Sequence, residues 1–175
     1  MKGGETLGDK QRLIFRVSLA LNALLIPLVI WGHFKMNYVN DQLFLKEVEY
    51  NLIELEDLIT KQSHDNWTNA NLVTTEFRNV LNSMGYGMRT NQTLTEDNSV
   101  ILYKLYEKLK QYPHEQKDNH PVLTDQDKKN FEELQEILHD VGLGLNVKGS
   151  DDMESFINRA AELEKRIRAP LNHTD

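Results

Sequence analysis

The sequence predicts an all-α protein, with a single N-terminal transmembrane helix followed by an extracytoplasmic antiparallel bundle of four to five helices. The first observation is one long apolar run near the N-terminus, in a chain whose mean hydropathy is −0.55 overall. The second is that apolar residues beyond this run recur at steps of three and four, which is the spacing of one helix face. The third is that the alternation typical of strands is nearly absent.

The apolar run extends from Leu13 to Phe34 and is interrupted by Arg16. As a helix it would be roughly 33 Å long at about 1.5 Å per residue, and the hydrocarbon core of a bilayer is about 30 Å thick. The alternative is a signal peptide, which is cleaved after small residues of the A-x-A type. The segment WGHFKM at 31–36 is bulky and offers no such site. We therefore predict a signal-anchor that is retained.

Cations flank the apolar run unequally. Four precede or open it, whereas only Lys35 closely follows it. By the positive-inside rule, the N-terminus stays in the cytoplasm and the larger part faces outward. The predicted organisation, in the cell membrane, is a short cytoplasmic tail over residues 1–12, a transmembrane anchor over 13–34 and an extracytoplasmic helical domain over 35–175. The four N-terminal cations are Lys2, Lys10, Arg12 and Arg16.

Charge and composition restrict the partners that the outer domain is expected to bind. The formal net charge is −7, and because residues 1–34 hold four cations and two acids, residues 35–175 carry −9. An acidic surface is repelled by polyanions, so no nucleic-acid interface is predicted. The chain has no cysteine, which excludes disulfides and thiol chemistry. The outer domain must therefore be held together by an apolar core, and its length is sufficient for one.

Five helical segments are predicted beyond the anchor, at about residues 39–62, 68–84, 93–113, 124–142 and 150–170. Each carries an apolar stripe, and the five stripes should form one core. Between the anchor and the first segment only Gly32 interrupts, which allows one continuous helix. The stripes comprise Leu45, Val48, Leu52, Leu55 and Ile59; Leu72, Val73, Phe77, Val80, Leu81 and Met84; Ile101, Leu102, Leu105, Tyr106 and Leu109; Phe131, Leu134, Ile137, Leu138 and Val141; and Met153, Phe156, Ile157, Ala160, Leu163 and Ile167.

Cap residues and glycines predict where these helices begin and end. The triplet GYG at 85–87 should end the second segment, and Gly142 should follow the fourth as its C′ residue. The segment TLTE at 93–96 resembles a capping box at the start of the third segment. Thr124 and Ser150 are the predicted N-caps of the fourth and fifth segments.

The densest group of possible metal ligands is the segment HEQKDNH at 114–120. His114, Asp118 and His120 are the candidate ligands, because imidazole and carboxylate groups bind divalent cations. Two features argue against a site: the histidines lack the i, i+4 spacing of a helix, and Lys117 competes for the carboxylate. A polar loop has the same composition, so no cofactor is predicted.

Sequence signatures of the common catalytic sites are missing. The patterns H-E-x-x-H, G-x-S-x-G, the P-loop and G-x-G-x-x-G do not occur. The chain is therefore not predicted to be an enzyme. Clustered acids on the first and fourth segments are interpreted as solvated helix faces. These acids are Glu54, Glu56, Asp57, Glu132, Glu133 and Glu136.

Three N-glycosylation sequons begin at Asn66, Asn91 and Asn172. They would face outward in the predicted topology, where glycosylation takes place in a secretory pathway. Such triplets also arise by chance in a chain rich in Asn and Thr, and this is the interpretation that we prefer.

Two polar side chains lie inside the apolar run. Asn22 falls close to the predicted bilayer midplane, and Ser18 lies four residues earlier on the same helix face. Leu25 and Val29 continue this strip. A carboxamide at this depth either bonds back to its own helix or bonds to a partner span or a second copy. Ser18 and Asn22 are therefore candidate contacts with another transmembrane helix.

These features predict a membrane-anchored accessory or interaction protein. It would present its helical bundle to another membrane or extracytoplasmic protein, or self-associate. The alternative is an extracytoplasmic module that senses a small ligand. Because the chain has one span and a tiny cytoplasmic tail, such a sensor would have to signal through a partner.

Overall fold

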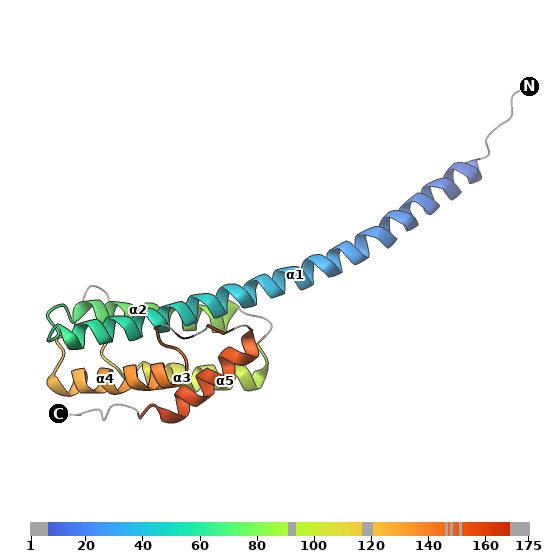
Figure 1. Cartoon of the computed structure of the whole chain (residues 1–175). Coiled ribbons are helices and arrows are strands. Elements are labelled where there is room, and N and C mark those ends of the chain that lie inside the picture. The colour runs from blue at the N-terminus through green and yellow to red at the C-terminus, as the bar shows by residue number, and fades with distance from the viewer. Residues whose placement is uncertain are drawn as a thin grey trace, which may run out of the picture. The chain divides into compact units, whose positions relative to one another are not determined.

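A computed structural model of the chain describes residues 7–90, 94–116, 121–145, 147, 149–150 and 152–168. Over these residues the chain is all-helical and has no strand, as the sequence predicts (Figure 1). It divides into two compact units, Met1–Val39 and Asn40–Asp175, and the first helix contributes to both. The helices are α1 (Leu7–His64), α2 (Asn71–Thr90), α3 (Glu96–Leu109), α4 (Asp125–Asp140) and α5 (Met153–Arg166).

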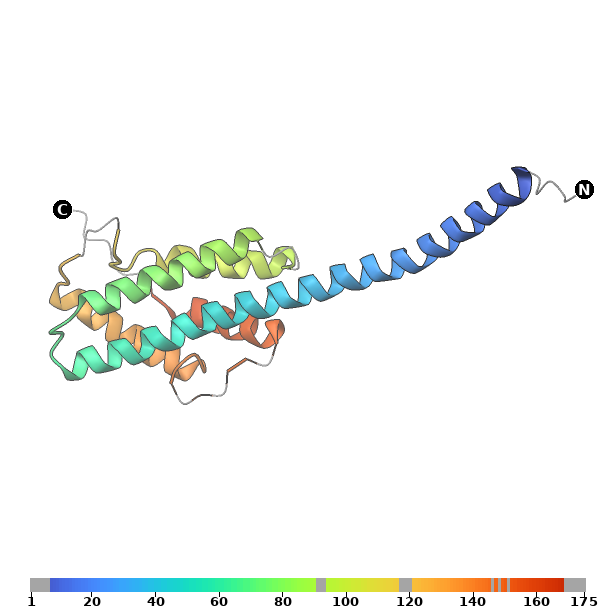
Figure 2. The same cartoon turned by 90° about the horizontal axis from the view of Figure 1, so that it is seen from above.

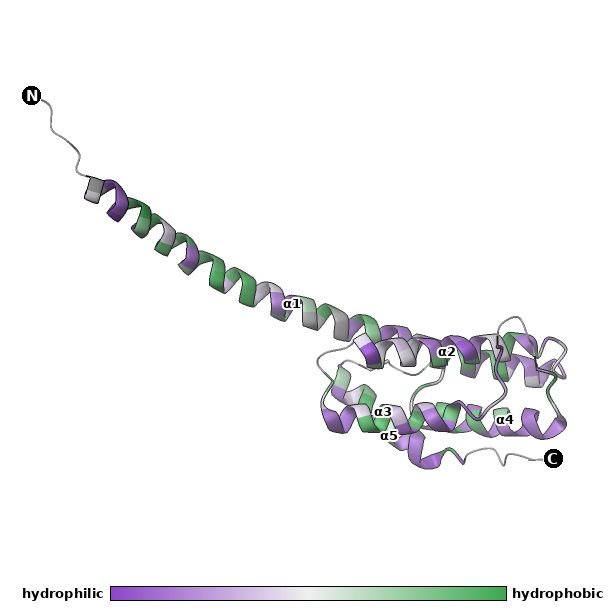
Figure 3. Ribbon diagram, turned by 180° about the vertical axis from the view of Figure 1, so that it is seen from behind, coloured by the Kyte–Doolittle hydropathy of each residue, from purple (hydrophilic) through white to green (hydrophobic). Residues whose placement is uncertain are grey.

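The Met1–Val39 unit contains the N-terminal part of α1, which carries mostly hydrophobic residues (Figure 3). Within it, Lys10–Met36 is a 27-residue stretch that is long and apolar enough to cross a membrane. None of its most apolar window is buried against the described chain. The helix runs through Pro27 and Gly32 without a break. The prediction of one N-terminal apolar helix able to span a membrane is confirmed.

The Asn40–Asp175 unit has a single apolar core to which all five helices contribute. Within this unit, α1 and α2 lie side by side in one layer, and α3, α4 and α5 form the other (Figures 1 and 2). Helix α3 packs against α2 and α5, and α4 packs against α5. Most of the predicted stripe residues are buried in this core. Leu72 is exposed over 46% of its surface. Five further stripe residues are partly buried and pack against the core: Ile101, Tyr106, Ile137, Val141 and Met153.

Aromatic rings from four parts of the chain meet in the centre of this core. Phe77 of α2 stacks on Tyr112, which follows α3, with ring centroids 5.4 Å apart. Phe131 of α4 meets Phe77 edge-on at 5.6 Å and Trp67 at 6.1 Å. Burying a side chain such as Phe77 or Phe131 is worth about 1.5–3 kcal/mol. These rings therefore join α2 and α4 to the connection between α1 and α2 and to the connection after α3.

Two predicted helix ends of α4 are confirmed. Thr124 is the N-cap, and it forms a capping box with Asp127: the Asp127 amide donates to Thr124 Oγ1 at 3.1 Å and the Thr124 amide donates to Asp127 Oδ2 at 2.9 Å. Gly142 follows the helix with a φ of +81°, which favours glycine. The amide of Leu143 then donates to the Leu138 carbonyl at 2.8 Å, which completes a Schellman-type end.

The predicted starts of α3 and α5 are wrong in detail. Helix α3 is capped by Thr95, whose side chain accepts from the Asn98 amide, so the predicted box does not form; residues 91–93 lie outside the described part. Helix α5 is capped by Asp152, whose Oδ1 accepts from the Ser155 amide at 2.8 Å. Ser150 lies two residues before this cap, and both its amide and its hydroxyl donate to one oxygen of the buried Glu49, each at 2.7 Å.

The predicted end of α2 at residues 85–87 is also wrong, because the helix continues through both glycines to Thr90. A glycine inside a helix costs about 1 kcal/mol relative to alanine, so another interaction must favour the helix here. At Gly87 this interaction is helix packing. The ring of Phe44, from α1, occupies the space that a side chain on Gly87 would need.

Candidate functional site

The two polar residues predicted to contact another span both lie in the Lys10–Met36 helix. Ser18 and Asn22 are exposed, and their side chains make no hydrogen bond or ion pair within the described chain. The structure therefore shows no bond from Asn22 back to its own helix. Their contact with a partner span stays a prediction.

The predicted metal candidates are placed only in part. The Nδ1 atom of His114 lies 2.8 Å from the Tyr112 carbonyl oxygen, and its Nε2 atom lies 3.3 Å from Nε2 of Gln116. Both ring nitrogens thus have a hydrogen-bonding neighbour. Asp118 and His120 lie outside the described residues. Within the part of the chain that the structure describes, no group of three His, Asp or Glu side chains has the arrangement of a metal site.

Glu115, from the same segment, has a structural role. It is 7% exposed, accepts from the Thr75 hydroxyl at 2.8 Å and pairs with the Arg78 guanidinium at 2.8 Å. Its backbone amide also donates to the Thr74 carbonyl. These bonds fasten the connection after α3 to α2.

Of the three sequons, only Asn66 is described, and it is exposed in the turn after α1 with a φ of +53°.

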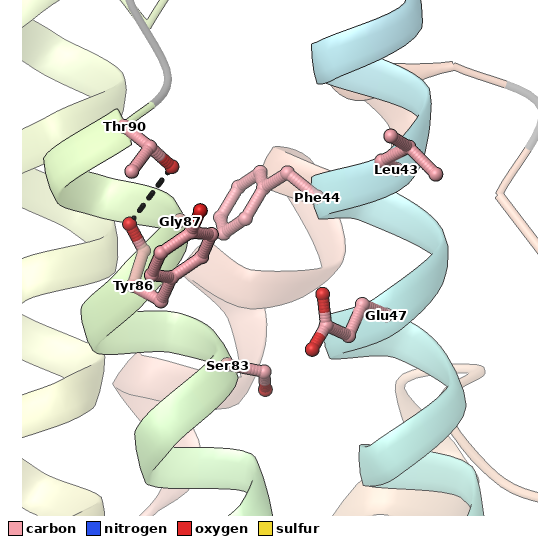
Figure 4. A pocket seen from close by; sticks show the side chains of 7 residues that line it. All are labelled: Leu43, Phe44, Glu47, Ser83, Tyr86, Gly87 and Thr90. Carbon is pink, nitrogen blue, oxygen red and sulfur yellow. Dashed lines mark hydrogen bonds between the residues drawn. The ribbon is translucent and has the colours of Figure 1, made fainter.

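A groove lies between α1 and α2 of the Asn40–Asp175 unit. It consists of two adjoining hollows of about 350 and about 360 Å³ that share three lining residues. Figure 4 shows the first, with Phe44 and Glu47 extending from α1 toward α2. We call this feature the α1–α2 groove. It is lined by Leu43, Phe44, Glu47, Asn51, Asn79, Asn82, Ser83, Tyr86, Gly87 and Thr90.

The shape of the α1–α2 groove depends on Phe44 and Gly87. A Cβ atom on Gly87 would lie 1.8 Å from Cδ2 of Phe44, so only glycine lets the ring reach α2. The ring is held from the other side by Phe156, edge-on at a centroid distance of 6.3 Å. Phe44 is 6% exposed, and it closes the apolar end of the groove. Tyr86, in contrast, is 63% exposed and forms an open aromatic wall.

The remainder of the α1–α2 groove is polar and acidic. Glu47 and Asn51 lie one turn apart on α1, opposite Asn79 and Asn82 of α2. The Asn51 amide donates to the Asn79 carbonyl across the groove at 3.5 Å. Carboxamides both donate and accept hydrogen bonds, whereas Glu47 adds a negative charge. This lining suits a ligand with amide-like and cationic groups.

A second carboxylate near this end of the groove is Glu76 of α2. Burial raises the pKa of the Glu76 carboxyl above its ordinary value, and the negative charge of Glu54 on α1 raises it further. The Asn79 amide opposes this rise, because it donates to Glu76 Oε2 at 2.9 Å. The negative potential of Glu54, Glu76 and Glu47 would therefore favour a cationic group in the groove.

The interpretation of the clustered acids as solvated faces is wrong for Glu56. This side chain is 4% exposed, and it accepts from the Leu145 amide at 3.0 Å and from the Gln135 side-chain amide. His139 Nδ1 lies 3.7 Å from it. Glu132 is half-buried and accepts from the indole N–H of Trp67 at 3.2 Å. These glutamates fasten connections between helices to the core.

The groove could not be predicted from the sequence, because its two walls are 28 or more residues apart and meet only in the folded unit. The one local signal is the GYG triplet at 85–87, which by its type predicts a helix end. Comparisons of the chain with models of known families, with curated proteins and with solved structures find no match.

Proposed function

We propose that this chain is a membrane-anchored accessory or interaction protein. Lys10–Met36 crosses the cell membrane once, and the helices of the Asn40–Asp175 unit are presented outside it to a partner protein. The observation that carries the proposal is the apolar stretch itself. It is 27 residues long and none of its most apolar window is buried within the described chain, so it needs lipid or protein around it.

The orientation rests on charge. Lys10, Arg12 and Arg16 lie at the N-terminal end of the span, and Lys35 alone lies near its other end. Lys35 is placed 5.2 Å from the centre of the Trp31 ring, an arrangement suited to the headgroup region. The positive-inside rule then favours a cytoplasmic N-terminus.

Exposed aromatic side chains support a role in protein binding. Tyr50 of α1, Tyr86 of α2 and Tyr103 of α3 are 64%, 63% and 58% exposed. Tyrosine is enriched at protein interfaces, because its ring buries a large area while its hydroxyl still forms hydrogen bonds. The core of the Asn40–Asp175 unit is complete without these three rings.

The proposal is tested by isolating the full chain from membranes in mild detergent and identifying co-purifying proteins by mass spectrometry. The matched variants are Tyr50→Ala and Tyr86→Ala, with Glu136→Ala as a control at another exposed position. A partner of the outer surface is recovered with wild type and the control but lost with a tyrosine variant. N-terminal sequencing of the same sample tests whether the apolar helix is retained as an anchor or removed by cleavage. A mature chain that starts between Gly32 and Asn40 would contradict the anchor.

The α1–α2 groove supports a second candidate function, the binding of a small cationic or amide-bearing ligand whose presence is signalled through a partner. Glu47 would supply the charge, and Asn51 and Asn82 would supply hydrogen bonds. The test is a thermal-shift screen of the full chain in detergent against amines and amino-acid amides. A stabilising compound should lose its effect in Glu47→Gln and keep it in Glu136→Gln, an exposed carboxylate on α4.

A further inference from the structure

The span contains two polar side chains that have no hydrogen-bond partner in the described chain. Ser18 and Asn22 are exposed on the Lys10–Met36 helix, and neither side chain forms a hydrogen bond within the described residues. In the membrane placement of the proposed function, on which this inference rests, Asn22 lies near the bilayer midplane. An unpaired carboxamide is costly there, because neither water nor lipid tails can pair with its donors and acceptor.

Asn22 belongs to a strip of positions separated by alternating steps of three and four. The mean step is 3.5 residues, which is the repeat that keeps one face of a helix against a second helix in a left-handed coiled coil. Its large apolar members are 47% to 69% exposed, so the strip is not covered by the chain itself. We call this strip the 15–36 seam. It comprises Phe15, Ser18, Asn22, Leu25, Val29, Gly32 and Met36.

The other features of the helix lie away from the 15–36 seam. Pro27 and Leu24 fall on the opposite side at helical spacing. Trp31 also falls outside the seam, and its ring is close to Lys35. At Gly32, which is part of the seam, an added Cβ would meet nothing within 4 Å. The seam is therefore free of the proline and of the bulky interfacial tryptophan, and a second helix can approach it.

A second copy of the chain satisfies Asn22 better than any other neighbour that these observations define. A carboxamide carries both a donor and an acceptor, so two of them facing each other can exchange two hydrogen bonds. Two copies insert in the same orientation and place Asn22 at the same depth. A single Asn at a seam position is also a feature that fixes register in parallel two-stranded coiled coils.

We infer that two copies of this chain associate in the membrane as a parallel dimer through the 15–36 seam, with the two Asn22 side chains hydrogen-bonded to each other. Ser18, one turn earlier, faces its counterpart across the same seam. Leu25, Val29 and Met36 pack against their counterparts on the other side of Asn22. The dimer would place two copies of the Asn40–Asp175 unit at one point in the membrane.

Because the chain has no cysteine, a single introduced cysteine reports its own contacts without background. Full-length variants are made at the seam positions Leu25, Val29 and Met36 and at the off-seam positions Ala20, Leu24 and Trp31. After oxidation in membranes, the seam positions should give disulfide-linked dimers and the off-seam positions should give several-fold less. Equal cross-linking at the seam and off-seam positions would overturn the proposal that the two helices contact each other through the 15–36 seam.

A relocated asparagine separates the role of Asn22 from its effect on hydropathy. Asn22→Leu should raise the dimer dissociation constant in detergent about 3- to 30-fold, the range expected for an interhelical hydrogen bond in a membrane. The double variant Asn22→Leu with Leu24→Asn keeps the composition and moves the carboxamide to the other side of the helix. It should dimerise as weakly as Asn22→Leu. A wild-type dimer dissociation constant in the double variant would overturn the role of Asn22.

The same samples distinguish a failure of this inference from a failure of the proposed function. Each variant is first extracted with alkaline carbonate. A chain that remains in the membrane pellet but stays monomeric, with wild-type Asn22, contradicts only the dimer. A chain released into the supernatant contradicts the membrane anchor itself.

Discussion

A Cβ atom on Gly87 would lie 1.8 Å from Cδ2 of Phe44, and this close approach of α2 to the ring explains two features of the Asn40–Asp175 unit. It explains why α2 continues through a glycine that would ordinarily favour its end. It also explains how Phe44 closes the apolar end of the α1–α2 groove. The ring has little room to move, since Phe156 packs edge-on against it.

Gly87→Ala is therefore expected to destabilise the chain even though alanine is the better helix former. Overlap with Phe44 should cost about 1–3 kcal/mol after the gain in helix propensity is included. Gly85→Ala is the matched control, two residues away. Its Cβ would meet its nearest neighbour at 3.7 Å, so it should stabilise by about 0.5–1 kcal/mol. Urea unfolding measures the change in the free energy of unfolding for each variant. Equal changes in the two variants would contradict the close packing of Phe44 against Gly87.

Glu56 provides a second comparison between a buried and an exposed carboxylate. Glu56→Ala removes the acceptor of the Leu145 amide and of the Gln135 side chain. A fully buried donor that loses its acceptor costs about 1–3 kcal/mol; these two donors are only partly buried, so a combined loss of about 2–4 kcal/mol is expected. Glu136→Ala, an exposed position on α4, should change the free energy of unfolding by about 0.5 kcal/mol or less. If both variants unfolded at the urea midpoint of wild type, the anchoring role of Glu56 would be excluded.

The stability of the chain should fall at high pH because of Tyr112. Burial raises the pKa of the Tyr112 hydroxyl from 10.0 to about 12, and the charge of Glu133 adds to the rise. Between these values the unfolded chain releases the phenolic proton while the folded chain keeps it, so the free energy of unfolding decreases as pH rises. A shift of this size corresponds to about 2–3 kcal/mol.

This contribution is isolated by comparing urea unfolding of wild type and Tyr112→Phe at pH 9 and pH 12. The variant should lose less stability than wild type over this interval. Tyr103→Phe, at a position where the ring is 58% exposed, serves as the control and should behave like wild type. A Tyr112→Phe variant with the wild-type pH dependence would contradict the burial of this hydroxyl.

Helix positions were predictable because they depend on local patterns. The spacing of Leu45, Val48 and Leu52 identifies one buried face whatever packs against it, and all three are at most 1% exposed. Thr124 and Gly142 were also predictable, since a cap and a left-handed C′ residue act within a few positions of their own helix end.

The errors arose where a distant residue decides the outcome. Ser150 is a good cap by type, but Glu49, more than a hundred residues away in sequence, takes its hydrogen bonds. Glu56 resembles its solvated neighbours until the connection after α4 folds over it. Gly87 resembles a helix end until Phe44 is placed beside it. The α1–α2 groove depends on the same kind of long-range contact, so sequence patterns could not predict it.

The central claim is that the chain crosses the membrane once, with its N-terminus inside and its helical unit outside. The most direct measurement is cysteine labelling of intact cells with a membrane-impermeant maleimide, since the natural chain has no cysteine to interfere. Two full-length variants are compared, Gly8→Cys before the span and Glu136→Cys on α4. The claim predicts that Glu136→Cys is labelled on intact cells and Gly8→Cys only after permeabilisation. Labelling of Gly8→Cys on intact cells, or protection of Glu136→Cys until the cells are permeabilised, would contradict it.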